Sequence, residues 1–420
     1  MEKICFVVGL YGDEVNGGAE KHCKMLAEQA SNLYDVEVLT STTNDYKTFT
    51  PFYPEGITHL NGVAVRRFNS KPFDRVAFDQ TYKKSRWGRK IRRLLYRTGL
   101  LKYIASIFPS WNIDLAKELK TLKLNGLYAP DLVDFLVTNE QDYQAIFLLS
   151  YPCPNFYFIN KRIPHRCILI PTAHDEGDFF RSYLSHIFTT VRHIAFNTEM
   201  ERVLCYRIFG NKMAPSSILA VGTELSEASS YTHIQEKYKL PEQYILYFGR
   251  IAKEKIGDLI DWFLEYKATS NDTVKLVLTG GIFMEKRDHP DIIYTGFVSE
   301  PEKTALIEYA QLVINPSDRE SLSLLLLETM QLGQLSLVNG KSDVLKQHCI
   351  DSDFAAQYYI SKSDFIHKLS RMLASDRLDE KEQQRQKAIR YVAKNYSWDK
   401  VMERLKGVVN SSLSEKSAQS

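Results

Sequence analysis

The sequence lacks any long uninterrupted hydrophobic run. A membrane-spanning helix needs about 18 consecutive apolar residues, and the apolar stretch from Ile146 to Ile159 is interrupted by Pro152, Pro154 and Asn155. The amino-terminal apolar run covers only residues 4–10 and leads into glycine and acidic residues, so it is too short for the core of a signal peptide. These absences favour a protein that is soluble or only peripherally attached to a membrane.

The sequence also lacks paired cysteines and a strong net charge. The six cysteines have no C-x-x-C spacing, which indicates reduced, structural thiols. The net charge is +3 over 420 residues, so attraction to phosphates or anionic lipids must come from local clusters. Hydrophobic residues make up 44% and charged residues 25%, which is ordinary for a globular protein and excludes wholesale disorder.

Two series of short apolar, β-rich runs alternate with helix-like segments. At about 150 residues per domain, 420 residues predict two or three domains. The first series covers residues 4–10, 36–40, 63–68, 145–150 and 167–171; the second covers 245–248, 274–278, 292–295, 312–315 and 335–339, with helices expected at 300–310 and 322–332. This alternation predicts an α/β protein of two doubly wound, Rossmann-like units in tandem.

Glycine, proline and polar residues interrupt the pattern between Phe209 and Pro241, where the domain boundary is expected. We predict an amino-terminal domain over 1–215, a carboxy-terminal domain over 216–390, a helix over 391–412 that packs back on the first domain, and a flexible tail over 413–420. Ligands of open α/β sheets bind at the carboxyl ends of strands, so two facing units predict a site in a cleft between them.

Residues 83–102 form a strongly basic segment. It contains Lys83, Lys84, Arg86, Arg89, Lys90, Arg92, Arg93, Arg97 and Lys102 without an acidic residue, while Ile91, Leu94, Leu95 and Leu101 keep helical spacing. The pattern predicts one basic amphipathic helix. Two interpretations are open: a solvated domain face with ordinary core contacts, or docking on an anionic membrane surface. Nucleic-acid contact is the weaker alternative, and nucleic acid is not an expected partner.

The stretch from Asn315 to Met330 is the most informative for chemistry. Glu320 follows an apolar run, Ser321 or Ser323 is suited to cap the next helix, and Glu328 lies about two turns inside that helix. The N–H groups of the first helical turn favour an anion such as phosphate, and the two carboxylates can accept hydrogen bonds from sugar hydroxyls. Two glutamates at this spacing also occur as solvated helix positions.

A second loop supplies cations. Arg250 and Lys255 follow the run that ends at Phe248 and Gly249. The planar guanidinium and the compact ammonium together suit a diphosphate. The alternative is a surface loop of mixed charge.

Together with further motifs, these segments resemble the retaining glycosyltransferases of family 4, which have the two-domain GT-B architecture. The further motifs are Gly17-Gly18-Ala19-Glu20, Pro171 to Glu176, Phe196 to Glu199, Val221-Gly222-Thr223, Gly280-Gly281, Thr295 to Val298 and Tyr396-Ser397-Trp398. A bacterial subgroup shares Asp45-Tyr46, Tyr53-Pro54 and residues 62–68. The resemblance therefore extends over nearly the whole chain.

The resemblance implies a role for each matching residue. His174, Arg250, Lys255 and Glu320 are the implied catalytic residues. Gly17, Gly18, Arg250, Lys255, Phe297, Val298, Glu320, Ser321, Leu322, Ser323 and Glu328 are the implied donor-binding residues. Within this set, Arg250 and Lys255 stabilise the leaving diphosphate, Glu320 holds the donor sugar and Glu328 binds the nucleotide ribose.

The implied activity is retaining transfer of a sugar from a nucleotide-sugar donor to a glycan or lipid-linked acceptor in bacterial surface polysaccharide biosynthesis, without a cofactor or metal ion. Two departures from the family pattern stand out: Ser321-Leu322-Ser323 where glycines are common, and Ile256 between Lys255 and Gly257. The alternatives are a nucleotide-sugar epimerase of the same architecture and a non-catalytic scaffold that attaches to membranes through the basic segment. A phosphorylase would need a lysine-bound pyridoxal phosphate, for which no motif is present.

Overall fold

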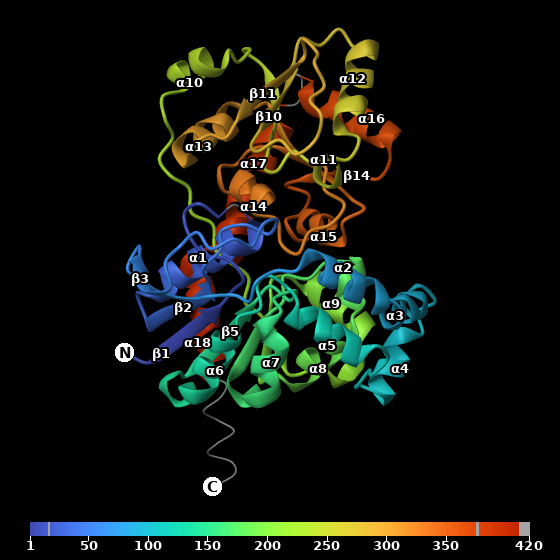
Figure 1. Cartoon of the computed structure of the whole chain (residues 1–420). Helices are drawn as coiled ribbons and strands as arrows, with labels where there is room; N and C mark the ends of the chain where they lie inside the picture. Colours follow the sequence, from blue (N-terminus) through green and yellow to red (C-terminus); the bar gives the residue numbers. More distant parts are fainter. Residues whose placement is uncertain (16, 375–377, 411–420) are drawn as a thin grey trace. The chain divides into compact units, whose positions relative to one another are not determined.

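A computed structural model of the chain describes residues 1–15, 17–374 and 378–410. These residues form two compact units (Figure 1). Unit 1 contains Met1–Val221 and the described part of Val401–Ser420, and unit 2 contains Gly222–Lys400. The domain limits expected from the sequence stay predictions, and the tail expected at 413–420 lies outside the described residues.

Unit 1 is built on a mixed sheet. In the described part of the chain this sheet has eight strands in the order β3-β4-β2-β1-β5-β6-β7-β8. The strands are β1 (Lys3–Val7), β2 (Asp35–Ser41), β3 (Gly56–Leu60), β4 (Val63–Phe68), β5 (Ala145–Leu149), β6 (Cys167–Ile170), β7 (His193–Phe196) and β8 (Ser216–Ile218). The pair β3–β4 is antiparallel, and the remaining neighbours are parallel. Central strands such as β5 are buried on both faces, as parallel sheets require.

The helices of unit 1 connect these strands. They are α1 (Gly18–Ala30), α2 (Arg75–Lys84), α3 (Trp87–Arg97), α4 (Leu101–Ile107), α5 (Leu115–Lys123), α6 (Pro130–Thr138), α7 (Asn155–Arg162), α8 (Ser182–Thr190) and α9 (Glu199–Phe209). Short 3-10 turns are η1 (Glu140–Asp142), η2 (Pro164–Arg166), η3 (Gly177–Phe180) and η4 (Gly210–Lys212). The turn η3 continues the loop that follows β6.

Unit 2 has a parallel sheet in the order β11-β10-β9-β12-β13-β14. Its strands are β9 (Tyr244–Phe248), β10 (Lys275–Thr279), β11 (Ile292–Gly296), β12 (Leu312–Asn315), β13 (Ser336–Asn339) and β14 (Gln357–Tyr359). In chain order this is 3-2-1-4-5-6, the doubly wound arrangement whose order reverses between β9 and β12. Ligands of such sheets bind outside the carboxyl ends of the strands at that reversal.

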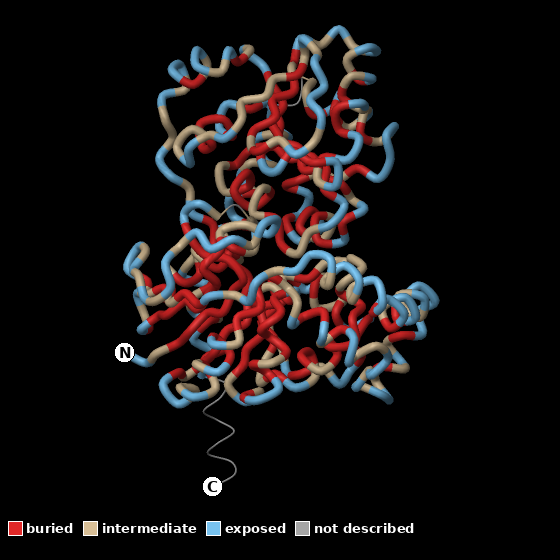
Figure 2. The backbone as a smooth tube through the Cα atoms, viewed as in Figure 1, coloured by how far each residue is buried: buried red, intermediate tan, exposed pale blue. Residues whose placement is uncertain are grey.

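The helices of unit 2 are α10 (Tyr231–Tyr238), α11 (Lys253–Ile256), α12 (Leu259–Thr269), α13 (Glu300–Tyr309), α14 (Leu324–Gln331), α15 (Asp343–Asp351), α16 (Lys362–Leu373) and α17 (Leu378–Tyr396). The helix α18 (Trp398–Asn410) follows, and its residues from Val401 belong to unit 1. Each unit has its own buried apolar clusters along its sheet, and Figure 2 shows the buried segments of the chain in red.

The expected fold class, two doubly wound α/β units, is confirmed by these sheets. The predicted runs coincide with strands because buried parallel strands are continuously apolar. The strands β3, β7, β8 and β14 were not predicted. In β3 exposed and partly buried residues alternate, so the strand has no continuous apolar run. The strands β8 and β14 have three residues each and are too short to show one.

The prediction of one basic helix over residues 83–102 is wrong. The segment contains the end of α2, then α3 and the start of α4. Ser85 ends α2, and Gly99 takes a left-handed φ of 74° between α3 and α4, which breaks the helical path. The helix expected at 322–332 begins later, at Leu324, because Ser323 is its N-cap.

Candidate active site

The cations and carboxylates predicted from the sequence follow the two central strands of unit 2. Arg250 comes directly after β9, and the loop that contains Glu320 comes directly after β12. These strands are the neighbours at which the strand order reverses. Both loops therefore lie at the position where open α/β sheets bind ligands.

Lys255 and Glu320 are in direct contact. Lys255 Nζ lies 3.0 Å from Glu320 Oε1, and both side chains are partly exposed. The short helix α11 places this lysine: Ile256 is buried in the core, and Gly257 ends the helix with a φ of 52°. The residue that separates Lys255 from the glycine thus anchors α11 and keeps Lys255 directed at Glu320.

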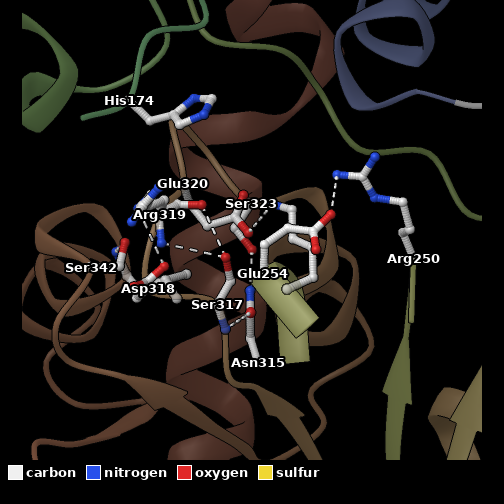
Figure 3. Close-up of polar contacts among 12 residues, drawn as sticks. His174, Arg250, Glu254, Asn315, Ser317, Asp318, Arg319, Glu320, Ser323 and Ser342 are labelled. Carbon is white, nitrogen blue, oxygen red and sulfur yellow. Dashed lines mark hydrogen bonds and ion pairs between the residues drawn. The ribbon is translucent and has the colours of Figure 1, made fainter. Parts of the chain in front are cut away.

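Arg250 forms a different ion pair. Its Nη2 lies 3.5 Å from Glu254 Oε1, and more than half of its side chain is exposed. Tyr247 lies next to the same loop and donates a hydrogen bond to the Arg250 carbonyl oxygen at 2.9 Å. Burial, and then the charge of Glu320, raise the pKa of the Tyr247 hydroxyl. The Arg250 backbone therefore lies near Tyr247, while the Arg250 guanidinium points to Glu254 (Figure 3).

The loop between β12 and α14 is held by its own polar side chains (Figure 3). Asn315 donates from Nδ2 to Ser323 Oγ at 2.8 Å and accepts from the Ser317 N–H at 3.1 Å. Ser323 Oγ accepts from the Leu326 N–H at 3.2 Å and so caps α14. The loop therefore turns directly into a helix start, which adds partial positive charge beside Glu320.

The sequence analysis missed a buried histidine that supports this loop. His348 of α15 is buried, and its Nε2 lies 2.8 Å from the Leu322 carbonyl oxygen. Because a carbonyl only accepts, Nε2 carries the proton, and Nδ1 accepts from the Tyr391 hydroxyl at 2.8 Å. Burial lowers the pKa of His348 to about 4, so the ring is neutral at pH 7.

Glu328 lies inside α14 and is almost fully buried. Its Oε2 is 2.9 Å from Nζ of Lys303 in α13, and this lysine also contacts Glu300 at 2.6 Å. A buried carboxylate requires such a partner. Lys303 was not predicted; its spacing from Glu300 indicates their own ion pair but gives no signal for the contact with Glu328 in another helix.

Two glycines bring the loops after β9 and β10 close together. The N–H of Gly249 donates to the Thr279 carbonyl at 2.9 Å, and a Cβ at Gly280 would collide with the Gly249 backbone. Gly280 also has a φ of 127°, which other residues rarely adopt. The neighbouring Phe297 is exposed at the end of β11, and Val298 packs against the core of unit 2.

The remaining predicted residues belong to unit 1. Gly17 is the N-cap of α1, where a Cβ would collide with the Glu20 carboxylate, while a Cβ at Gly18 would meet open space. Glu20 is buried and accepts a hydrogen bond from the Tyr46 hydroxyl. The close approach at position 17 is therefore to a flexible side chain of unit 1 itself.

His174 lies in the loop after β6, about one third exposed, with Nε2 at 3.3 Å from Glu176 Oε2. The loop is bent by Thr172, which has a left-handed φ of 51°. Buried Glu201 of α9 accepts hydrogen bonds from the N–H groups of Ala173 and Asn197, and burial raises its pKa to about 8. Glu201 thus fixes the backbone next to His174 and was also missed by the sequence analysis.

The structure brings together Lys255, Glu320 and Ser323 in unit 2, with Ser321 and Leu322 in the same loop. Arg250 and Glu328 lie in the same unit but have other ionic partners, Glu254 and Lys303. Among the described residues, no three His, Cys, Asp or Glu side chains are grouped so that they could hold a metal ion. Nor is any described helix long and apolar enough to cross a bilayer.

Comparison with known proteins identifies the architecture. Residues 242–370, which contain the Lys255 and Glu320 loops, match the family described as Glycosyl transferases group 1. Sucrose-phosphate synthase from Thermosynechococcus elongatus superposes with a TM-score of 0.69 over 99% of this chain and 100% of its own, at 14% identity. The chain has the GT-B fold.

Two further solved structures have the same GT-B fold. The Anabaena protein HepE, solved with UDP and glucose, gives a TM-score of 0.66 at 13% identity over 98% of this chain and 100% of its own. Trehalose-6-phosphate synthase OtsA gives 0.66 at 11% identity over 97% and 99%. No curated protein matches the sequence.

Proposed function

We propose that this chain is a glycosyltransferase that moves a sugar from a nucleotide-diphosphate sugar to a hydroxyl group of a glycan or lipid-linked acceptor. The contact between Lys255 and Glu320 at the strand-order reversal of unit 2 carries this proposal. In this contact, a cation that can bind a diphosphate lies beside a carboxylate that can accept hydrogen bonds from sugar hydroxyls. The match of residues 242–370 and the fold shared with a protein solved with UDP-glucose support it.

In this reaction the bond between the anomeric carbon and the diphosphate oxygen breaks, and negative charge builds on the leaving diphosphate. Groups that stabilise this charge in place lower the barrier. Arg250, Lys255 and the start of α14 supply positive charge, and Glu320 binds donor sugar hydroxyls. Glu328, oriented by Lys303, accepts hydrogen bonds from the ribose.

We further propose that His174 hydrogen-bonds the transferred sugar and that Gly17 and Gly18 border the donor. Phe297 and Val298 then lie at the nucleotide base. Transfer occurs on the front face with retention, and the fixed cations meet the diphosphate charge without a bound metal ion. The setting is bacterial polysaccharide synthesis in the cytoplasm at the inner face of a membrane; the six buried cysteine thiols fit a reducing compartment.

The test uses matched pairs of variants in donor binding and turnover assays. A panel of UDP-, GDP- and dTDP-sugars, starting with UDP-glucose, is screened by thermal shift and by release of free nucleotide. Lys255→Gln is paired with Lys253→Gln on the same helix, where Lys253 contacts Asp258. Glu320→Gln is paired with Asp318→Asn in the same loop, where Asp318 contacts Arg319.

We expect Lys255→Gln and Glu320→Gln to lower kcat/KM by about 10²-fold or more, while Lys253→Gln and Asp318→Asn remain close to the parent. Equal losses within a pair would contradict the site. Release of a donor sugar with altered configuration would instead show an epimerase, and a folded chain that turns over no donor would favour a scaffold. EDTA and product NMR test the metal and retention proposals separately.

A further inference from the structure

The part of unit 1 around the basic segment that contains no acidic residue extends beyond residues 83–102. Residues 80–113 contain nine Lys and Arg residues and no Asp or Glu. They lie at the end of α2, at the N-cap of α3, in α3 and in α4. These helices lie together at one edge of unit 1 (Figure 1).

Some of these cations point into unit 1 and are structural. Arg92 is 1% exposed and donates to Ser185 Oγ and to the Ile208 carbonyl. Arg89 pairs with Asp178 of η3 at 2.7 Å. The inner face of α3 is therefore fixed to unit 1, and its outer face cannot turn inward.

The outer face of α3 combines apolar and basic side chains. Trp87 is 59% and Leu94 63% exposed, and Ile91 lies between them, so the three share one stripe of the helix. Lys90 Nζ lies 5.5 Å from the Trp87 ring. Other exposed cations are Lys83, Lys84, Arg86 and Arg97, and other exposed apolar residues are Leu100, Tyr103, Ile107 and Phe108. Figure 2 shows much of this region as exposed.

We propose that this face of α3 and α4 docks on a bilayer rich in anionic phospholipid, with Trp87, Ile91 and Leu94 in the headgroup boundary and the exposed cations on lipid phosphates. A helix that lies in the interface presents this combination of an apolar stripe and Lys or Arg beside it. The phosphates of a nucleic acid would contact the cations, but the exposed stripe of Trp87, Ile91 and Leu94 would remain without an apolar partner. A second copy of the chain that docked through the same face would meet the same positive charge and be repelled.

This proposal extends the membrane setting given under the proposed function. It has its own readout, vesicle binding, so it can fail while the transferase activity stands. The experiment measures co-flotation of the full chain with phosphatidylcholine vesicles that contain or lack phosphatidylglycerol, at low and high salt. The variant Lys84→Gln/Lys90→Gln/Arg97→Gln is compared with Lys71→Gln/Lys120→Gln/Lys161→Gln, which removes three exposed charges of unit 1 outside α3 and α4.

We expect flotation only with phosphatidylglycerol, weakened by salt, and at least about tenfold weaker binding for the α2–α3 variant. The second triple variant should bind as the parent does. Leu94→Ser should bind at low salt and detach at a lower salt concentration than the parent. Flotation that ignores lipid charge, equal losses in both triple variants, or binding of homopolymeric RNA in place of vesicles would overturn the proposal.

Discussion

Ser323 has a backbone conformation that favours glycine. Its φ and ψ are 81° and 82°, in the left-handed region. Two hydrogen bonds to its hydroxyl offset that strain, one from the Leu326 N–H and one from Asn315 Nδ2. A serine can therefore occupy this left-handed position, because its two hydrogen bonds hold the turn.

Two substitutions of Ser323 separate the cost of its backbone strain from the contribution of its capping hydrogen bonds to stability. Ser323→Ala loses both hydrogen bonds and keeps the strain, whereas Ser323→Gly loses the bonds but relieves the strain. We expect both variants to be less stable, with Ser323→Ala the worse by about 0.5–1 kcal/mol. Chemical denaturation of the full chain measures the difference. A glycine variant as unstable as the alanine variant would show that the turn is unstrained.

At the scale of elements, buried groups from distant helices fix the two loops that contain the predicted site residues. His348 of α15 holds the loop before α14, and Glu201 of α9 holds the loop after β6. Neither residue is near its loop in the sequence. Local spacing therefore indicated the loops in which the site is predicted, but it could not predict what holds those loops in place.

His348 acts as a positioning residue for the Glu320 loop. His348→Leu leaves the Leu322 carbonyl without its side-chain donor, and we expect kcat to fall by about tenfold or more with little change in KM. His348→Gln retains a donor and should recover part of the rate. Cys349→Ala, a fully buried neighbour in α15, is the control for lost packing. If Cys349→Ala lowers kcat as much at equal folded fraction, the hydrogen bond has no special role.

Strands were predictable where burial makes the sequence uniform. Leu312–Asn315 has the predicted limits because every residue in it is buried. The edge strand Gly56–Leu60 was not predicted, because the exposure of its residues alternates and it has no continuous apolar run. The prediction for the basic segment was wrong for another reason. Its apolar spacing fits one helix, but Gly99 takes a backbone conformation that ends α3. The loops after β9 and β12 could be predicted because each follows an apolar strand, and the contact between Lys255 and Glu320 joins them.

At the scale of the whole molecule, the two units hold different buried titratable groups. In unit 1, burial raises the pKa of Glu201 to about 8 and that of Glu118 to about 7. In the folded chain these two carboxyl groups keep their protons up to the raised pKa values, whereas in the unfolded chain they release them near pH 4.5. The folding free energy of unit 1 therefore becomes less favourable as the pH rises toward 8. Burial lowers the pKa of His348 in unit 2 and of His22 and His193 in unit 1 to about 4. Stability from these histidines is complete above pH 6.5 and is lost as pH falls.

Between pH 6.5 and 8 the buried carboxyl groups of unit 1 therefore dominate. We expect the unfolding free energy of unit 1 to fall by about 2 kcal/mol over this interval, while that of unit 2 changes little. Native-state hydrogen exchange measures the unfolding free energy of each unit separately, once the exchange rates are corrected for the intrinsic effect of pH. Glu201→Gln cannot titrate and should remove most of the decline in unit 1, although it weakens the loop beside His174. An equal decline in both units, or an undiminished decline in Glu201→Gln, would show that Glu201 does not titrate in this range.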